Sequence, residues 1–307
     1  MTSIFENTHS KVTIHILHDD TLTDENRQKF IHTAEKYSQG LELHDISAHK
    51  DILNDPRIDY ARNRYSVGAL FRLFIPEMMP ELDRVIYLDC DVLCNRDIAD
   101  LWNIDVHDYA MAGGIDLPEL NGSIYREKMR LVLNGCRPET YINSGVLLMN
   151  LARIRERGVL SQMCIDWLAR RGEMALAADQ DALNSIFAGD IKILDSTFNQ
   201  NILIPDMSGC IIHTLFGKPW RNMRGLQSDR IYWKMYLRSA WGENVTCEEL
   251  VDVLNDAAVT VRHTKSKFRR AYNFIKDRVI GRVIPFRTLH YIRIEIAVRF
   301  RQMFTRS

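Results

Sequence analysis

Two carboxylates separated by one residue follow a short apolar run in the first third of the chain. Asp89 and Asp91 flank Cys90 directly after residues 85–88, which read Val-Ile-Tyr-Leu. Alternate residues of an extended chain point to the same side, so both carboxylates can converge on one cation. In open α/β sheets, ligands bind beyond the carboxyl ends of the strands, where this pair is expected. The pattern therefore predicts a divalent-metal site.

Two other interpretations of this pair stay open at the level of the local pattern. In the first, one carboxylate caps the next turn and the other is solvated, as is common for so short a pattern. In the second, Asp89 is the nucleophile of a phosphatase, since an apolar strand ends in the same pattern in such enzymes. Those enzymes resemble one another in a Thr or Val two places after the second Asp, and this chain has Leu93 there. The phosphatase hypothesis is weakened by that difference.

A histidine and a lysine lie close together in a second segment, residues 211–220. His213 leaves an apolar run, and Gly217 and Lys218 come directly before a proline. Imidazole suits a transition metal, glycine lets backbone approach a phosphate, and lysine supplies positive charge. Taken alone, a histidine after a strand is more often a hydrogen-bonded structural residue.

Two further segments carry polar side chains that have ordinary structural explanations when each is taken alone. Asn143 lies in an Asn-Ser-Gly sequence before an apolar run, which is typical of a turn. Asp179 and Gln180 open a predicted helix, where acidic residues complement the helix dipole.

Strand-like and helix-like stretches alternate along the chain. Runs rich in apolar or β-branched residues predict strands at 12–17, 85–88 and 145–149. Helices are predicted at 23–37 with Thr23 as the cap, at 67–74, at 159–170 and at 181–187. This alternation predicts an α/β sheet, largely parallel, with helices on both faces.

Composition allows a large globular domain and separates the chain into two parts by charge. Apolar residues make up 46% and charged residues 26% of 307 residues, which excludes a disordered or collagen-like chain. The formal charge is zero, but residues 260–307 hold thirteen Lys and Arg against Asp277 and Glu295. A basic segment of this kind is typical of contact with anionic partners.

Cysteine usage and hydropathy bear on the expected compartment. The six cysteines show no CxxC pair and no regular spacing, which argues against a zinc site and a disulfide framework. No signal peptide is evident at the start, and no run of about 18 apolar residues is present. We therefore expect a cytoplasmic protein.

The joint order of the four polar segments resembles glycosyltransferase family 8. This family comprises retaining transferases, among them bacterial lipopolysaccharide glucosyl- and galactosyltransferases and glycogenin. The resemblance extends from about residue 12 to about residue 241 and includes Arg72, the segment 114–117 and Asn199.

The resemblance implies a fold, a donor and an acceptor. The fold would be GT-A, a Rossmann-like α/β sandwich. The donor would be UDP-glucose or UDP-galactose, bound with Mn²⁺, or with Mg²⁺ in its place. The acceptor would be a glycan or glycolipid of the cell envelope, such as the lipopolysaccharide core, and no nucleic acid is expected as a partner.

The resemblance also implies a role for each matching position. Asp89, Asp91 and His213 match the metal ligands, and Gly217 and Lys218 match the residues at the donor diphosphate. The positions that match the donor-sugar site are Arg72, Asp116, Asn143, Asp179 and Gln180. Of these, Asp179 and Gln180 are predicted to be catalytic, with Gln180 stabilising the face of a short-lived oxocarbenium opposite the leaving group.

Two departures from the family pattern qualify these expectations. Residues 1–245 are predicted to form the catalytic domain, and this domain is expected to lack the first strand, which helps to bind uridine in the family. An alternative hypothesis is therefore a catalytically silent or truncated binding protein. In addition, Gly217 and Lys218 are adjacent, so the loop after His213 is one residue shorter than usual.

Residues 246–307 are predicted to form a basic helical region. Apolar residues interleave with arginines around residues 292–304, which suits an amphipathic helix on an anionic membrane surface. This interpretation predicts peripheral association with the inner face of the cytoplasmic membrane. The alternative is a tail packed on the catalytic domain with its arginines solvated.

Overall fold

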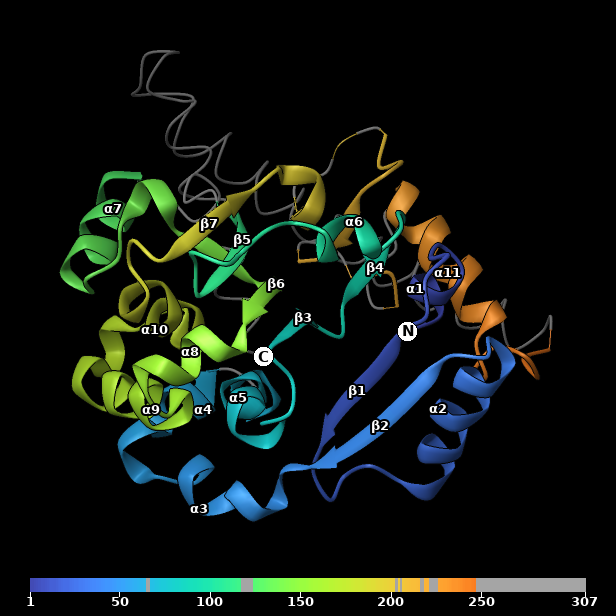
Figure 1. The fold of residues 1–307 in the computed structure, drawn as a ribbon, viewed down its shortest axis with the longest axis horizontal. Helices are drawn as coiled ribbons and strands as arrows, with labels where there is room; N and C mark the ends of the chain where they lie inside the picture. Colours follow the sequence, from blue (N-terminus) through green and yellow to red (C-terminus); the bar gives the residue numbers. More distant parts are fainter. Residues whose placement is uncertain are drawn as a thin grey trace, which may run out of the picture.

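The computed structural model describes residues 1–64, 67–116, 124–201, 204, 206–215, 218–220 and 226–246. Gly217 and almost all of the predicted basic region 246–307 lie outside the described residues. In the described part, helices and strands alternate along the chain. The strands form several sheets, and the helices pack around them (Figure 1).

The first sheet has two parallel strands, β1 (Thr13–His18) and β2 (Gly40–Asp45), after a short helix α1 (Thr2–Phe5). The crossover between the strands is α2 (Asp24–Lys36), as the sequence predicts. Thr23 caps this helix, because its side chain accepts a hydrogen bond from the Asn26 amide at 3.2 Å. Among the described strands, β1 pairs with β2 alone.

The second sheet has four strands in the order β3-β6-β5-β7. Its members are β3 (Arg84–Leu88), β6 (Ile142–Asn150), β5 (Met111–Ile115) and β7 (Ile191–Leu194). A third, small sheet pairs β4 (Val92–Cys94) with β8 (Ile211–His213), and Val92 lies opposite His213. This pairing brings the segment that contains Asp89 and Asp91 next to the segment that contains His213.

The prediction of a largely parallel sheet is wrong for the described strands. β6 runs antiparallel to both β3 and β5, and β4 runs antiparallel to β8, whereas only β1–β2 and β5–β7 are parallel. The reason is that a continuous apolar run reports burial of both faces of a strand and contains no information on its direction. The mixed α/β class itself is confirmed.

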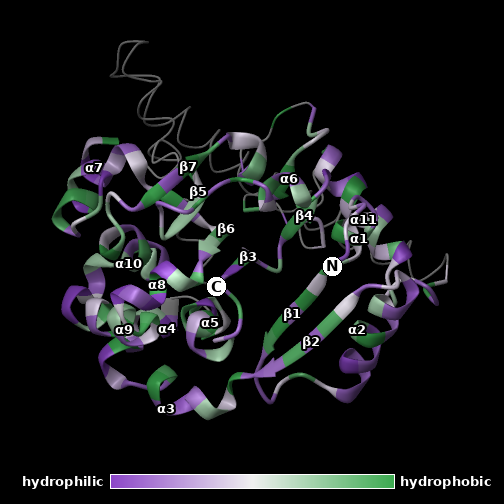
Figure 2. Ribbon diagram, in the orientation of Figure 1, coloured by the Kyte–Doolittle hydropathy of each residue, from purple (hydrophilic) through white to green (hydrophobic). Residues whose placement is uncertain are grey.

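The longest strand, β6, forms the centre of the core. Every residue from Ile142 to Met149 is buried, and successive side chains enter two different hydrophobic clusters. Leu147 packs in a cluster with helices α9 and α10, and Leu148 packs in a cluster with α1 and β4. In Figure 2, β6 is coloured mostly towards the hydrophobic end, and the helices around it carry both hydrophobic and hydrophilic residues. The predicted Asn-Ser-Gly turn is wrong, since these residues lie within β6.

The remaining helices surround these sheets. They are α3 (Lys50–Leu53), α4 (Asp59–Arg64), α5 (Ile75–Met78), α6 (Ala99–Trp102), α7 (Ile124–Leu133), α8 (Leu151–Arg157), α9 (Leu160–Arg171), α10 (Ala178–Ile186) and α11 (Gln227–Arg238). The predicted helix at 67–74 is a 3₁₀ helix, Val67–Phe74, and the one at 181–187 begins three residues earlier, at Ala178. None of the described helices has the length and apolar character needed to span a membrane.

Candidate functional site

Asp89, Asp91 and His213 converge at the ends of two strands. The Asp pair follows β3, and His213 is the last residue of β8. His213 Nε2 lies 3.7 Å from Asp89 Oδ2 and 3.2 Å from Asp91 Oδ1. Two hydrogen bonds to the Asp91 carbonyl, from the Thr214 amide and hydroxyl, fix the position of the Asp91 backbone beside β8. The predicted set of metal ligands is therefore assembled.

The protonation state of His213 fits a metal ligand. Its Nδ1 lies 3.0 Å from Asn143 Oδ1 and 3.2 Å from Asn199 Oδ1, and both amide oxygens can only accept. The proton therefore resides on Nδ1, and Nε2 presents a lone pair. Burial lowers the pKa of His213 to about 4, so the ring is neutral near pH 7. Within the described part of the chain, Nε2 is buried without a hydrogen-bond partner.

The donor set matches a divalent cation. Two carboxylates and one neutral imidazole, with further positions open to a substrate or water, suit Mn²⁺ and related metals. An unpartnered buried nitrogen is costly in the metal-free state and is satisfied when it coordinates a cation. These residues therefore fit a divalent metal.

Lys218 adds a positive charge to the rim of this cluster. Its ammonium forms an ion pair with Asp91, on the carboxylate oxygen that does not face His213. A cation in the site would compete with Lys218 for Asp91, and an anionic ligand would attract Lys218.

Arg72 connects the metal cluster to a second buried carboxylate, that of Asp179. From the 3₁₀ helix Val67–Phe74, its guanidinium lies 2.8 Å from Asp89 Oδ1 and 3.1 Å from Asp179 Oδ2. The face of the guanidinium also stacks over the Tyr87 ring, 4.4 Å from the ring centroid. Burial raises the pKa of Asp179 to about 6, and Arg72 counteracts this shift.

Gln180 is held by four hydrogen bonds. Its amide oxygen accepts from Asn143 Nδ2 at 3.1 Å and from the Ser144 amide at 3.0 Å. Its amide nitrogen donates to Asp116 Oδ2 at 2.8 Å and to the Tyr141 hydroxyl at 3.0 Å. The predicted donor-sugar residues are thus joined directly to one another. Burial raises the pKa of Asp116 above its ordinary value.

The backbone before Asp179 is strained. Ala178 has φ of 40°, in the left-handed region that residues with a Cβ avoid. Such conformations persist only where the surrounding structure fixes them, and they are concentrated at functional sites. One contact that fixes the backbone here is a hydrogen bond of 3.1 Å, which the Ala177 amide donates to Asp181 Oδ2.

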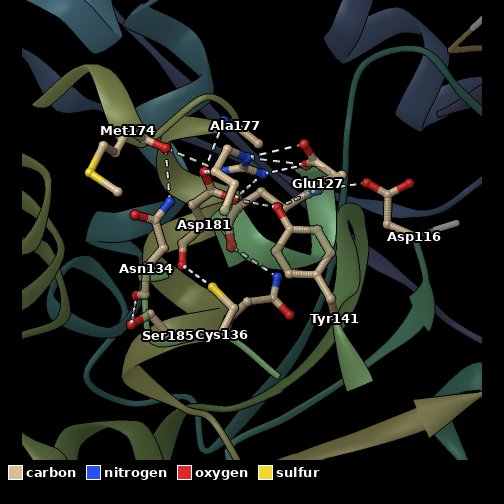
Figure 3. Close-up of polar contacts among 12 residues, drawn as sticks. Asp116, Glu127, Asn134, Cys136, Tyr141, Met174, Ala177, Asp181 and Ser185 are labelled. Carbon is tan, nitrogen blue, oxygen red and sulfur yellow. Dashed lines mark hydrogen bonds and ion pairs between the residues drawn. The ribbon is translucent and has the colours of Figure 1, made fainter. Parts of the chain in front are cut away.

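Asp181 lies in a buried network of hydrogen bonds and ion pairs (Figure 3). The Tyr141 hydroxyl donates to Asp181 Oδ1 at 2.6 Å and accepts from Gln180 on its other side. Arg130 of α7 pairs with both oxygens of Asp181 and is itself paired with Glu127. In the same region Asn134 donates to the Met174 carbonyl at 2.8 Å, which ties α7 to the segment before α10.

The sequence predicted the residues that face the site but not the residues that hold them. Tyr141 and Asp181 stand in the segments singled out by sequence, where they had no assigned role. Arg130 carries no recognisable signal, because its partner lies on another helix far along the chain. Of the predicted site residues, only Gly217 is outside the described part.

Comparison with known proteins identifies the family. The model of glycosyl transferase family 8 matches residues 1–222. A curated Haemophilus influenzae protein described as a glycosyltransferase is 30% identical over 199 residues, which cover 64% of this chain and 57% of that protein. Glycosyltransferase GlyF of Streptococcus pneumoniae is 27% identical over 201 residues, which cover 61% of this chain and 44% of GlyF. The chain thus spans about half the length of these relatives.

The fold also has solved counterparts. The galactosyltransferase LgtC, crystallised with donor and acceptor sugar analogs, superposes with a TM-score of 0.64 at 22% identity, over 82% of this chain and 93% of LgtC. At that identity the likeness concerns the fold, and it confirms the GT-A expectation. With the family model matching most of its length, this chain belongs to glycosyl transferase family 8.

Proposed function

We propose that this chain is a metal-dependent retaining hexosyltransferase whose donor is UDP-glucose or UDP-galactose. The observation that carries the proposal is the buried, unpartnered Nε2 of His213, which faces Asp89 and Asp91 beside a connected set of polar residues. The family match and the likeness to a galactosyltransferase support this choice of reaction.

Asp89, Asp91 and His213 would hold the cation, which we propose to be Mn²⁺, with Mg²⁺ as a substitute. A cation held there supplies charge compensation to the diphosphate as UDP departs. Lys218, already beside Asp91, adds a second positive charge at the same place. Gly217 is proposed to let the backbone approach the diphosphate.

The donor sugar is proposed to lie against Arg72, Asp116 and Asn143. Arg72 orients two carboxylates, those of Asp89 and Asp179, and so couples the metal side of the site to the sugar side. Asp116 and Asn143 each form a hydrogen bond with Gln180. A sugar hydroxyl that contacts either residue is therefore positioned relative to the Gln180 amide. Alignment of the sugar by several fixed groups lowers the entropic cost of reaching the transition state.

Gln180 and Asp179 are proposed as the catalytic residues. When the acceptor hydroxyl attacks the donor sugar on the face that UDP leaves, the anomeric configuration is preserved. The Gln180 amide stabilises positive charge on the opposite face of the sugar. Four hydrogen bonds hold this amide in place before the reaction, which limits reorganisation during it. Asp179 contributes negative charge through a carboxyl that Arg72 keeps ionised near pH 7.

We propose a cell-envelope glycan or glycolipid, such as the lipopolysaccharide core, as the acceptor. The basic region 260–307 would bring the enzyme to the anionic inner face of the cytoplasmic membrane, where lipid-linked acceptors are found. In this proposal residues 1–245 form the catalytic domain, and residues 246–307 form the membrane-surface region.

A screen of UDP-sugars for Mn²⁺-dependent hydrolysis tests the function. We expect release of UDP from UDP-glucose or UDP-galactose. The variant Asp91→Asn should lose this activity and keep its fold, which circular dichroism measures. The alternative, a binding protein without turnover, predicts binding of UDP with Mn²⁺ by calorimetry but no hydrolysis of any UDP-hexose. Absence of both binding and hydrolysis contradicts both candidates.

A further inference from the structure

A second cluster of metal-ligating side chains lies on the two-stranded sheet, away from Asp89 and Asp91. His15 of β1 lies opposite Glu42 of β2 in the parallel register, and His44 follows two residues later on the same face of β2. The side chains of His15 and His44 are 19% and 17% exposed, and that of Glu42 is 56% exposed. A cluster with two half-buried imidazoles and one accessible carboxylate is thus open to solvent on one side.

The three ligand atoms stand at the separations that a small coordination sphere requires. His15 Nδ1 lies 2.9 Å from His44 Nε2, and Glu42 Oε2 lies 3.4 Å from the former and 3.7 Å from the latter. The point equidistant from three atoms so spaced lies about 2.0 Å from each, which is the length of a Zn–N or Zn–O bond. A transition-metal ion therefore fits between them without separation of the strands.

The metal-free arrangement shows how the ion would be accommodated. The planes of the two imidazole rings meet at 24°, with centroids 5.2 Å apart. The 2.9 Å contact between His15 Nδ1 and His44 Nε2 is an N–H···N hydrogen bond, in which one of the two nitrogens carries the proton. An ion would take the place of this hydrogen bond: the proton would move to the other nitrogen of its own ring, and each ring would turn its free nitrogen towards Glu42. The side of the cluster that faces solvent, where the Glu42 side chain is 56% exposed, leaves room for that rotation.

We propose that His15, Glu42 and His44 form a second metal site, selective for Zn²⁺ and similar transition metals, with water completing the coordination. Two imidazoles and one carboxylate favour Zn²⁺, Co²⁺ or Ni²⁺, whereas the two carboxylates of the first cluster suit Mn²⁺ and Mg²⁺. The ion links β1 to β2, whose mutual pairing is the only ladder of this sheet among the described strands. The role of this ion is to stabilise the sheet of β1 and β2, in which β1 contacts the 3₁₀ helix Val67–Phe74 that carries Arg72.

Co²⁺ titration of the untagged full chain tests the site, since bound Co²⁺ is visible by absorbance and calorimetry counts it. We use Asp91→Asn to weaken the first cluster, and expect this variant to retain one Co²⁺ per chain. Adding His44→Gln should lower the remaining affinity at least tenfold, and adding Glu42→Gln should weaken it while both imidazoles stay. His107→Gln, which changes an exposed histidine outside the cluster, is the matched control and should alter nothing.

Thermal unfolding gives a second measurement. Zn²⁺ should raise the Tm of Asp91→Asn, and this shift should disappear when His44→Gln is added. His15→Asn is the second variant if His44→Gln does not fold. The proposal is overturned if Asp91→Asn binds no Co²⁺, or if His44→Gln and His15→Asn both leave Co²⁺ affinity and the Zn²⁺-induced Tm shift unchanged.

Discussion

Gly145 of β6 lies directly against the imidazole of His213. A Cβ placed on Gly145 would stand 2.0 Å from His213 Cε1 and 2.6 Å from Nδ1, closer than any real contact. The absence of a side chain at Gly145 therefore defines the space into which His213 turns towards Asp89 and Asp91.

Gly145→Ala should displace His213 and weaken metal-dependent UDP binding about tenfold or more, because the ring cannot keep its place beside a methyl group. Isothermal titration of Mn²⁺ and UDP measures this loss. Gly172→Ala is the control: it strains a residue at φ 52°, but a Cβ there meets nothing within 4 Å. We expect that variant to lose stability and keep Mn²⁺ and UDP affinity. Equal affinity in both variants would contradict the assigned role of Gly145.

Tyr141→Phe should lower kcat about tenfold, or about 1.4 kcal/mol, with little change in UDP affinity. The variant removes the hydroxyl that joins Gln180 to Asp181, while Gln180 keeps Asp116, Asn143 and Ser144 as partners. Steady-state kinetics with the donor identified by hydrolysis separates kcat from KM. Tyr125→Phe, at an exposed position of α7, should leave both constants unchanged. A pure KM effect in Tyr141→Phe would show that the hydroxyl serves binding instead.

Arg130→Met should destabilise the protein by about 3–5 kcal/mol, because it leaves the fully buried Asp181 carboxylate without its cation. Addition of Asp181→Asn removes the unpaired negative charge and should recover part of the lost unfolding free energy. Urea unfolding of the two single variants and the double variant measures the coupling between the two residues. Additive effects would contradict a buried ion pair that acts as a unit.

The pH dependence of stability should carry a contribution from His213 in metal-free protein. Burial holds its folded pKa at about 4, below the ordinary value of 6.5, so the unfolded chain binds more protons between these values. Its contribution to stability is therefore fully present above pH 6.5 and is lost as the pH falls to about 4, with a total of roughly 3 kcal/mol. The difference in unfolding free energy between wild type and His213→Asn, measured with a chelator from pH 4 to 7, should grow with pH. A constant difference would show that the ring titrates normally.

Truncation after Asn255 should release the protein from anionic liposomes, because it removes the basic residues of the C-terminal region. Co-sedimentation with vesicles that contain phosphatidylglycerol measures the bound fraction, and vesicles of phosphatidylcholine alone are the control. An unaltered bound fraction would favour a tail that packs on the catalytic domain.

Local pattern was enough to predict the elements on which the site is built. The run before Asp89 is a strand, Thr23 caps a helix, and Asp179 and Gln180 lie in the first turn of α10. These features depend on neighbouring residues, through backbone alternation and capping, and so they are visible in a short window of sequence. The order of the polar segments also identified the family.

Strand direction and the supporting contacts required the tertiary structure. The antiparallel course of β6 was not predictable from its apolar run, and neither was its start at Ile142, ahead of the expected turn. The pairing of Arg130 with Asp181, the Gly145 space for His213 and the convergence of His15 with His44 each join elements that are separate in the sequence. The sequence by itself thus determined the types and spacing of the residues that are predicted to bind a metal and a sugar donor at the first cluster. Only the tertiary structure decided which tautomer, rotamer and ion pair each adopts, because these depend on burial and on partners that the fold supplies.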